Sequence, residues 1–526
     1  MKKLIALLLA LVMVIGLVAC GKTDAPSVDT PADAPADAPA DAPADAPSDA
    51  VAYKENIIIG TEIAVSSIDI HEKGDVAAIY LCRMTHDTLV DLDIASSTIV
   101  PSLAKEWEWV DDVTLRLTLR DDVKFHNGEA LTADDVVFTF ERAAASVSGS
   151  GSATNAQKLE SIVAEGDYTV VMKLKEVNVD WLSILASPNS IIMNREAVEA
   201  DAVNGPSVGT GAWILDEYVA NDYTVVTVNE NYWSDVPVTK QVTLQYIPET
   251  SARLLALESG EIDVCQEITA IDAAMVEANP ELSLIRRSTG GVTYLAMDVS
   301  EAPFNNKDLR LAMAHAIDKN EINAIVNGGY AEIAVSNWGL FTLGLDKDMQ
   351  DYEYNLDLAK EYLAASGVTE VTISSNTRDM YAGPVTVLQQ QMAKIGLKVN
   401  VETLESAAMS ANSAFDVHTH EAMVHGYGWS PLAADARGHF CPGVNSNKNI
   451  LDDATVNALI AEAEQEFDTA KRVELYQEVQ KISFDEVYGI PLFYIVKFNA
   501  TAAGIEGVDW DALHGSDFTY VALPIA

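Results

Sequence analysis

Residues 114–138 have the sequence TLRLTLRDDVKFHNGEALTADDVVF, which combines three kinds of local structure. Leucines alternate with polar residues over residues 114–120, and this period of two predicts a half-exposed antiparallel strand. The His-Asn-Gly at residues 126–128 then predicts a tight turn. Thr132 and Asp135 form a capping-box pattern ahead of an apolar run, so a helix should begin there. The stretch therefore predicts a domain that mixes strands and helices.

The pattern on either side of this stretch differs. The first half contains further strands, whereas beyond residue 303 helix and strand alternate, which indicates a mainly parallel sheet. We therefore expect a fold of the α+β or α/β class with at least two lobes. The expected strands are 56–60, 262–264, 371–373 and 397–401, and the expected helices are 250–260, 308–326, 356–365, 383–395 and two within 453–484.

The charge of the chain excludes some partners and specifies none. Its 526 residues hold 33 Lys and Arg against 79 Asp and Glu, for a formal net charge of −46. Proteins that bind nucleic acid need a basic face, so we expect no nucleic-acid partner.

The sequence does not contain the common enzyme motif Cys-x-x-Cys. Cys82, Cys265 and Cys441 could form one disulfide at most, and we expect them to be small buried residues.

The amino terminus has the features of an export signal. Met1-Lys-Lys precedes a 16-residue apolar run, which is short for a spanning helix but typical of the core of a secretory signal. The run ends Leu-Val-Ala-Cys-Gly at residues 17–21, which resembles the bacterial lipobox. The resemblance implies that residues 1–19 are a signal peptide and that Cys20 carries lipid, which would hold the protein on the extracytoplasmic face of the cell membrane. The alternative is an ordinary signal peptide with an incidental cysteine.

Residues 20–52 follow as a tether. Between residues 23 and 50 the chain is almost only Asp, Ala, Pro and Ser, which cannot bury apolar surface and favours extended polyproline II. About 30 such residues could reach roughly 90 Å at ~3.1 Å per residue. We expect this segment to be disordered and to take no part in the fold.

Several motifs occur in an order that resembles the family 5 extracellular solute-binding proteins, the peptide- and nickel-binding components of ABC importers. The resemblance covers about residues 55 to 526. The motifs are PSLAKEW at residues 101–107, VKFHNGEALTADDVVF at 123–138, VGTGAW at 208–213 with NYW at 231–233, ARLLALESGEID at 252–263, Pro-Phe at 303–304 through AHAIDK at 314–319, and LYQEVQ at 475–480 with IPLFY at 490–494.

The resemblance implies a two-lobed, periplasmic-binding-protein-like clamp that closes on its ligand. Lobe I would comprise residues 53–98, 206–300 and 495–526, with a subdomain of residues 99–205 inserted in it, and lobe II would comprise residues 301–494. The chain would cross between the lobes near Ser300 and near Tyr494. We expect most motif residues to shape the fold: Asp134 and Asp135 cap a helix, Gly128 makes a turn, and Arg310 pairs with Asp318 across neighbouring helical turns.

Peptide-binding relatives carry a Gly-Trp element at the back of the cleft, and here this element is Gly428-Trp429. Those relatives have an Asp three residues after the Trp, and some have an Arg three residues before it. In this chain those positions hold Leu432 and Gly426, which puts recognition of free peptide termini in doubt. Asp435 is then the nearest acid that could substitute.

Four further residues complete the candidate ligand-binding set. Arg437 is a second possible substitute for the missing charges. Tyr427 and Trp429 would offer flat aromatic walls that accept varied side chains. Arg378 could bind a carboxylate bidentately, and Tyr381 lies just after it. For each charged residue, the alternative is an ordinary position in solvent, and for Trp429 it is a place in the core.

Three histidines support a different ligand. If residues 417–419 form a strand, His418 and His420 share one face and could chelate a transition metal, with His425 nearby. His420 and His425 are five residues apart, which separates them by about 140° on a helix and excludes the zinc-protease motif. Polar residues on a strand and a loop are the simpler interpretation, and we expect no resident metal or cofactor.

Together these features predict a lipid-anchored, monomeric receptor that captures a small solute, a di- or oligopeptide in the first instance, and delivers it to an ABC permease and its ATPase subunits. A nickel or metal-chelate receptor of the same architecture is the alternative. A secreted hydrolase is the third hypothesis, although we expect the protein itself to hydrolyse nothing.

Overall fold

The computed structural model describes residues 51–73, 76–93, 98–148, 150–376, 379–429, 433, 435–444, 446–511 and 515–525. Residues 51–526 form one compact unit, to which the following description applies. The predicted signal peptide, Cys20 and nearly all of the tether lie outside the described residues, as does Arg378. No helix in the described ranges combines the length and the apolar character needed to span a bilayer.

A 10-stranded sheet forms the framework of the described chain. Its order is β15 (Lys398–Leu404), β14 (Glu370–Asn376), β16 (Ala422–Tyr427), β13 (Leu282–Met297), β17 (Ile490–Ala502), β12 (Val264–Ile268), β2 (Asn56–Thr61), β11 (Gln241–Tyr246), β10 (Tyr223–Val228) and β9 (Trp213–Val219).

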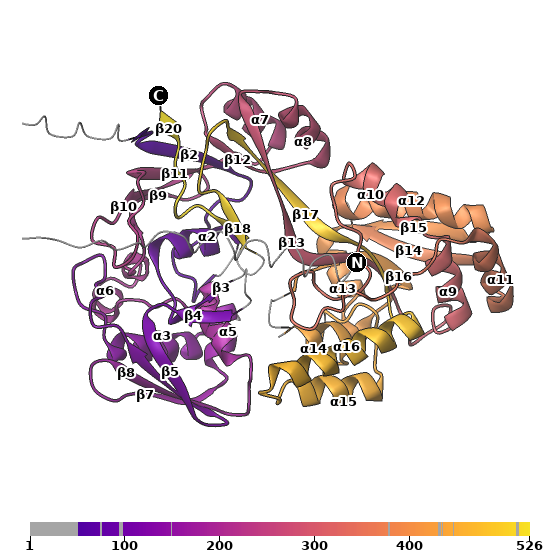
Figure 1. The fold of residues 1–526 in the computed structure, drawn as a ribbon, viewed down its shortest axis with the longest axis horizontal. Coiled ribbons are helices and arrows are strands. Elements are labelled where there is room, and N and C mark those ends of the chain that lie inside the picture. The colour runs from indigo at the N-terminus through magenta and orange to yellow at the C-terminus, as the bar shows by residue number, and fades with distance from the viewer. Residues whose placement is uncertain are drawn as a thin grey trace, which may run out of the picture. The chain divides into compact units, whose positions relative to one another are not determined.

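Two long strands, β13 and β17, connect the two parts of this sheet. They pair antiparallel from Leu282 with Ala502 to Leu295 with Ile490, and the register shifts between Ser288 and Val292. Figure 1 shows them running together from the elements around β12 to those around β16. We use "lobe II" for residues 298–489, which leave from β13 and return at β17, and "lobe I" for the remaining described residues.

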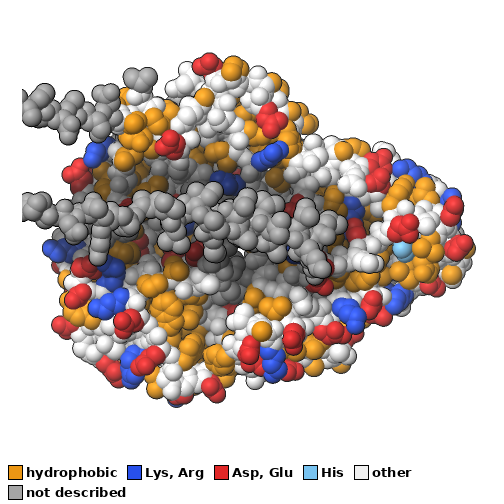
Figure 2. Space-filling view, viewed as in Figure 1, with side chains coloured by type: hydrophobic (Ala, Val, Ile, Leu, Met, Phe, Trp, Pro, Cys, Tyr) orange, Lys and Arg blue, Asp and Glu red, His pale blue; other side chains and the backbone are white. Residues whose placement is uncertain are grey.

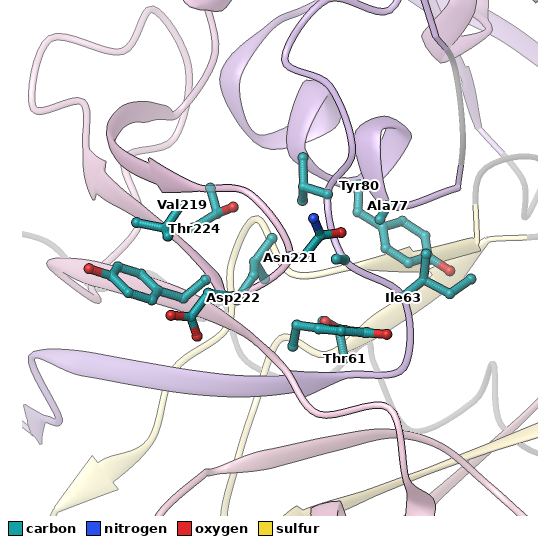
Figure 3. Close-up of a pocket in the computed structure, with 13 residues that line it drawn as sticks. Thr61, Ile63, Ala77, Tyr80, Val219, Asn221, Asp222 and Thr224 are labelled. Carbon is teal, nitrogen blue, oxygen red and sulfur yellow. The ribbon is translucent and has the colours of Figure 1, made fainter.

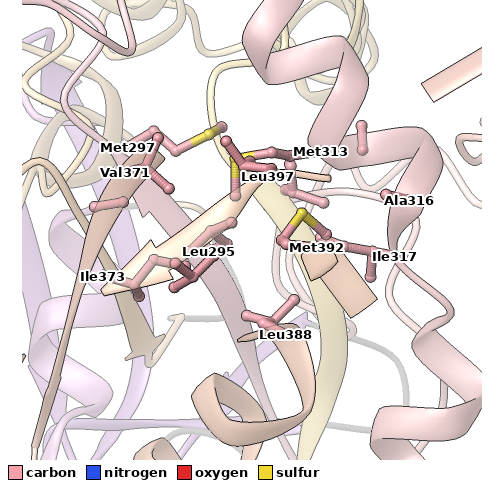
Figure 4. Packing of buried hydrophobic residues seen from close by; sticks show 14 of the residues in the cluster. Leu295, Met297, Met313, Ala316, Ile317, Val371, Ile373, Leu388, Met392 and Leu397 are labelled. Atoms are coloured by element: carbon pink, nitrogen blue, oxygen red, sulfur yellow. The ribbon is translucent and has the colours of Figure 1, made fainter. Parts of the chain in front are cut away.

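Lobe II packs helices against its part of the sheet. Leu295, Ile373, Leu388 and Met392 are fully buried together in its core, which Figure 4 shows. A second cluster contains Trp338, Phe440 and Tyr476. The helices are α9 (Lys307–Ala316), α10 (Lys319–Val326), α11 (Leu356–Ser366), α12 (Asp379–Ile395), α13 (Ser406–Asn412), α14 (Ala436–Phe440), α15 (Ala454–Ala463) and α16 (Thr469–Glu486).

Lobe I contains a subdomain with its own hydrophobic core. Its sheet has the order β5 (Ala104–Asp111), β6 (Thr114–Leu119), β8 (Thr169–Leu174) and β7 (Leu159–Ala164). The elements packed with it are α3 (Ala133–Ala145), α4 (Gly151–Ala156), α5 (Trp181–Ala186), α6 (Arg195–Ala200) and the pair β3 (Val90–Asp93) and β4 (Thr98–Pro101). The rest of lobe I adds α2 (Val76–Thr85), α7 (Thr250–Glu258), α8 (Ala270–Glu277), β1 (Ala52–Tyr53), β18 (Asp509–Asp511), β19 (Gly515–Asp517) and β20 (Pro524–Ile525).

The opening prediction for residues 114–138 is confirmed. In β6 buried and half-buried residues alternate, and Gly128 turns the chain with a φ of 89°. The Asp135 carboxylate accepts hydrogen bonds from the Thr132 backbone N–H at 3.0 Å and from its hydroxyl at 2.8 Å, so the capping box forms. Cys82, Cys265 and Cys441 are free and buried, as expected.

Two of the motifs meet at one half-buried carboxylate. Asp87 accepts hydrogen bonds from the Thr210 hydroxyl at 2.7 Å, the Tyr232 hydroxyl at 2.9 Å and the Trp233 indole at 2.8 Å. Burial raises the pKa of Asp87, and these three hydrogen bonds oppose the rise. The motifs at residues 208–213 and 231–233 therefore hold lobe I together.

Other sequence-based predictions are wrong in part. Residues 308–326 form two helices, because Asp318 begins α10 by accepting hydrogen bonds from the N–H groups of Asn320 and Glu321. Arg310 does not pair with Asp318: its guanidinium donates to the carbonyl oxygens of Phe304 and Glu486. The buried carbonyls at the ends of neighbouring segments compete successfully for the cation.

The sheet of the second half is mixed and not mainly parallel. β14 pairs in parallel with β15 and β16, whereas β13 pairs antiparallel with both β16 and β17. Residues 417–419 are not a strand, since Phe415–Val417 is a short 3-10 turn and β16 begins only at Ala422. The strand expected at residues 262–264 begins at Val264 and continues to Ile268, and the Asp263 side chain ahead of it binds Lys54 and the Ile58 N–H.

Acidic and basic side chains are interspersed on the face of the described chain in Figure 2.

Candidate functional site

An aromatic cluster lies where β16 ends beside the crossing strands. Trp429 is 4% exposed, and its ring lies 4.6 Å from that of Trp338, 5.4 Å from that of Tyr427 and 6.3 Å from that of Phe440, measured between centroids. Trp338 is fully buried and donates its indole N–H to the Leu343 carbonyl at 2.9 Å. We call Trp338, Tyr427, Trp429 and Phe440 the aromatic wall.

Glycines set the position of the wall. A Cβ added at Gly339 would lie 2.4 Å from the Cβ of Trp429, so only glycine permits this approach. A Cβ added at Gly291 would lie 2.8 Å from the Tyr427 carbonyl oxygen, which brings the wall against β13 near its register shift. Gly428 itself is exposed, and among the described residues no atom lies within 4 Å of the place its Cβ would take. As far as the described chain shows, the Gly428 side of Trp429 is therefore open.

A fully buried histidine lies behind the wall. The ring of His439 lies 4.7 Å from Tyr427, 5.0 Å from Tyr294 and 5.3 Å from Trp429. Burial lowers its pKa to about 3 and that of His425 to about 4, so both imidazoles are neutral at pH 7.

Several polar atoms of this cluster lack partners. Within the described residues, both ring nitrogens of His439, the Tyr294 hydroxyl and the Trp429 indole N–H have no hydrogen-bond partner. Buried polar atoms are usually paired, and those left unpaired at a site are available to water or to a ligand.

Tyr381 is brought to the same region. A Cβ added at Gly426 would lie 3.2 Å from the Tyr381 hydroxyl and 3.3 Å from the side chain of Ile495 on β17. Gly426 occupies the position where some relatives carry Arg. The structure therefore brings together Tyr381, Tyr427 and Trp429, whereas Arg378 lies outside the described residues.

The two charged candidates lie next to the wall and engage the protein itself. Asp435 begins α14, and its backbone carbonyl accepts a hydrogen bond from the Tyr427 hydroxyl at 3.2 Å. The Arg437 guanidinium pairs with Glu464, with 2.8 Å between Nε and Oε1. Contact of Asp435 or Arg437 with a ligand stays a prediction.

Each of the three histidines contacts different protein groups. For His418, one ring nitrogen lies 2.8 Å from the Phe415 carbonyl oxygen and the other lies 3.2 Å from the Asp298 carboxylate. A ring nitrogen of His420 lies 2.9 Å from the Lys448 carbonyl oxygen. His425 packs edge-to-face against Tyr294. In the part of the chain that the structure describes, no three His, Cys, Asp or Glu side chains could hold a metal ion together.

Sequence reasoning missed Trp338, His439 and Tyr294. They come from a loop, from α14 and from β13, and no local pattern distinguishes them from ordinary core residues. The pairing of β13 with β16 places Tyr294 opposite His425, and long-range packing brings His439 and Trp338 into the same cluster.

Two recesses in the described part of lobe I deserve comparison with this site. One, of about 160 Å³, is lined by Arg83, Asp87, Asp91, Tyr232 and Asp517 among others, and Arg83 and Asp517 form an ion pair of 2.9 Å within it. The other is a smaller pocket beside the end of β2, between α2 and the turn that carries Asn221 and Asp222 (Figure 3). Neither includes a residue of the predicted site.

Two lobes joined by paired crossing strands, with an aromatic wall beside the crossing, define a two-lobed binding protein of the periplasmic type. The family model described as bacterial extracellular solute-binding proteins, family 5 Middle, matches residues 98–449. This chain belongs to that family, whose members are the solute-binding components of ABC importers and are not enzymes.

The relatives bind different solutes. The chain is 27% identical over 467 residues to the probable ABC transporter periplasmic-binding protein SapA of Escherichia coli, covering 81% of this chain and 85% of that one. It is 25% identical to di/tripeptide-binding protein 2 of Pseudomonas aeruginosa (81% and 87% covered) and 24% identical to the nickel-binding periplasmic protein of E. coli (78% and 84%). The solved structure of the substrate-binding protein CtaP from Listeria monocytogenes has the same fold, with a TM-score of 0.81 at 21% identity, over 90% of this chain and all of that one.

Proposed function

We propose that this protein captures short peptides between its two lobes and delivers them to an ABC permease, whose ATPase subunits supply the energy. The observation that carries the proposal is the aromatic wall beside the crossing strands, with its open flank at Gly428 and its unpaired Trp429 indole. The relatives include a di/tripeptide-binding protein, which supports the same class of solute.

The wall suits a ligand whose side chains vary. Flat aromatic rings bury apolar groups of many shapes at low entropic cost, and a few polar groups fix the orientation. His425 and His439 are neutral at pH 7, so they add hydrogen-bonding capacity without charge. We propose that Tyr381, Tyr427 and Trp429 contact the peptide. Asp435 is the candidate for its amino group, since Leu432, which lies outside the described residues, cannot pair with it.

Calorimetric titration of the full-length protein with peptides of two to eight residues tests this proposal. We expect binding in part of that range, and W429F should weaken it by about tenfold, as expected for an aromatic residue at the centre of a site. The matched control is W107F, since Trp107 lies on β5 in the separate core of the subdomain. No binding at any length would refute the choice of peptide, and equal effects of the two variants would refute the role of the wall.

A metal chelate is the second candidate, favoured by the nickel-binding relative and by the adjacent rings of His418 and His420, 6.3 Å apart. Because no three metal-binding side chains converge within the described chain, the solute would have to bring most of the ligands itself. Titration with Ni²⁺ alone and with Ni²⁺ plus free histidine tests it. Unchanged metal affinity in the triple variant H418A/H420A/H425A would exclude these residues.

We further propose that residues 1–19 are removed, that Cys20 is lipidated, and that residues 20–52 tether a monomer to the extracytoplasmic face of the membrane. The support is the sequence of residues 1–21 and the composition of the tether. Mass spectrometry of the mature amino terminus should show an acylated cysteine. The C20A variant should lack the mass of the acyl chains and should leave the membrane fraction. A C20A variant that stays in the membrane fraction would refute lipid anchoring through Cys20.

A further inference from the structure

One buried ion pair joins the two lobes. Asp180 precedes α5 in the subdomain of lobe I, and Arg472 lies in α16 of lobe II. The Arg472 guanidinium donates to the Asp180 carboxylate across 2.5 Å, and each side chain is only 7% exposed. Most ion pairs of this chain with both partners inside one lobe are far more exposed, for example Lys173 with Glu160, at 45% and 53%.

Neither charged side chain stabilises the helix at which it lies. Asp180 occupies the N-cap position of α5, yet its side chain accepts no capping hydrogen bond. Arg472 lies near the amino end of α16, where the helix dipole disfavours a positive charge. That end is already capped by Asp468, which accepts hydrogen bonds from the N–H groups of Ala470 and Lys471.

The pair lies within a larger contact between the lobes. Trp109 of β5 packs edge-to-face against Phe467, which precedes α16, with 5.9 Å between ring centroids. From Arg472 the packing continues inward: its guanidinium lies 5.9 Å from the Tyr476 ring, and Tyr476 lies 5.1 Å from Trp338 of the aromatic wall. The ion pair is therefore contiguous with the candidate site.

We infer that Asp180 and Arg472 form a latch that holds the closed arrangement of the lobes and so positions the aromatic wall over a captured solute. This inference rests on the proposed function, in which the lobes open and close. Opening would return both charges to water, whereas closing buries them together. A buried ion pair is only weakly stabilising against an apolar pair of similar size, but removal of one partner leaves an uncompensated buried charge.

The surroundings of Asp180 agree with this role. Burial raises the pKa of Asp180, Arg472 opposes the rise, and Glu464 and Asp435 add to it. Arg472 is thus the group that favours the ionised form of the Asp180 carboxylate, against its burial and the neighbouring acids. The latch favours one relative position of the two lobes, because only in that position does the Arg472 guanidinium lie beside the Asp180 carboxylate.

Distance measurements by pulsed electron paramagnetic resonance test the latch. Nitroxides at V163C on β7 and I325C on α10, which are 48% and 62% exposed, report on the separation of the lobes in the full-length protein. Measurements are made without solute and with a tryptic digest of casein as the peptide probe. We expect D180N to lower the ratio of closed to open molecules at least about tenfold, as for breaking a buried charge pair. The control E160Q, which removes the exposed partner of Lys173, should change nothing.

A double variant separates the latch from a general loss of structure. In D180L/R472M both charges are replaced by apolar groups, so the closed population should recover towards that of the wild type. An unchanged ratio in D180N, no recovery in the double variant, or a wild type without closed molecules in either condition would overturn the latch. If the digest shifts no population while D180N still opens the protein, the peptide proposal fails and the latch stands.

Discussion

Replacing Arg310 by Met should destabilise this protein by several times more than replacing Asp318 by Ala. Arg310 is 4% exposed, and its guanidinium donates to the Phe304 carbonyl oxygen at 2.6 Å and to the Glu486 carbonyl oxygen at 2.7 Å and 3.3 Å. It thereby ties the start of lobe II to the carboxyl end of α16. Asp318 has a local task, since it only caps α10.

The magnitudes follow from these contacts. R310M leaves two buried carbonyl groups without their donor, at about 1–3 kcal/mol each. It also removes a cation from the end of α16, where the helix dipole favours one by about 0.3–1 kcal/mol. The buried apolar side chain of Met restores part of the lost stability, so we expect the free energy of unfolding to fall by roughly 3 kcal/mol. Loss of the Asp318 cap should cost about 1 kcal/mol.

Urea unfolding of the full-length protein at pH 7, followed by circular dichroism, measures both variants and their combination. Because the two side chains have no shared partner, the double variant should be additive within about 0.5 kcal/mol. K360M, at an exposed Lys whose ion pair among the described residues is with Asp357 at 3.7 Å, is the control and should change little. A coupling above about 1 kcal/mol between R310M and D318A would show that the two residues interact, and would refute the contacts described here.

Three further results are expected. D87A leaves the donors of Thr210, Tyr232 and Trp233 unpaired, so urea unfolding should show a loss of about 3 kcal/mol or more, and D87N should lose less. The pKa of His439 is about 3 when folded and about 6.5 when unfolded, so its contribution to stability is full above pH 6.5 and falls as the pH drops towards 3; H439F should flatten the pH dependence of the urea midpoint between pH 7 and 4, and an unaltered slope would contradict the assignment. G339A displaces Trp429, so peptide affinity should fall in calorimetry while the far-ultraviolet spectrum is retained, and unaffected affinity would argue against the wall.

Local features of the fold could be predicted from the sequence because their causes are local. Thr132 and Asp135 are three residues apart, so the capping box is visible in the sequence, and the alternation in β6 follows from its two faces. The break at Asp318 was missed because periodicity continues across it, and only the hydrogen bonds of its side chain begin a new helix.

The candidate site was predictable only where its residues are consecutive. Tyr427 and Trp429 belong to one motif, whereas Trp338 and His439 join them through long-range packing that no spacing shows. The latch could not be predicted from the sequence. Asp180 and Arg472 are 292 positions apart, and each looks like an ordinary residue near a helix end.

The place of β17 in the sheet constrains the order in which the chain can fold. β17 fills the gap between β12 and β13, yet it is made only after all of lobe II, at Ile490–Ala502. Until it emerges, β12 and β13 each keep an unpaired edge, which is a hazard for association between unfinished chains. Ile490, Leu492 and Phe493 of β17 also lie in the core of lobe II, so the strand that is made last completes both halves of the molecule.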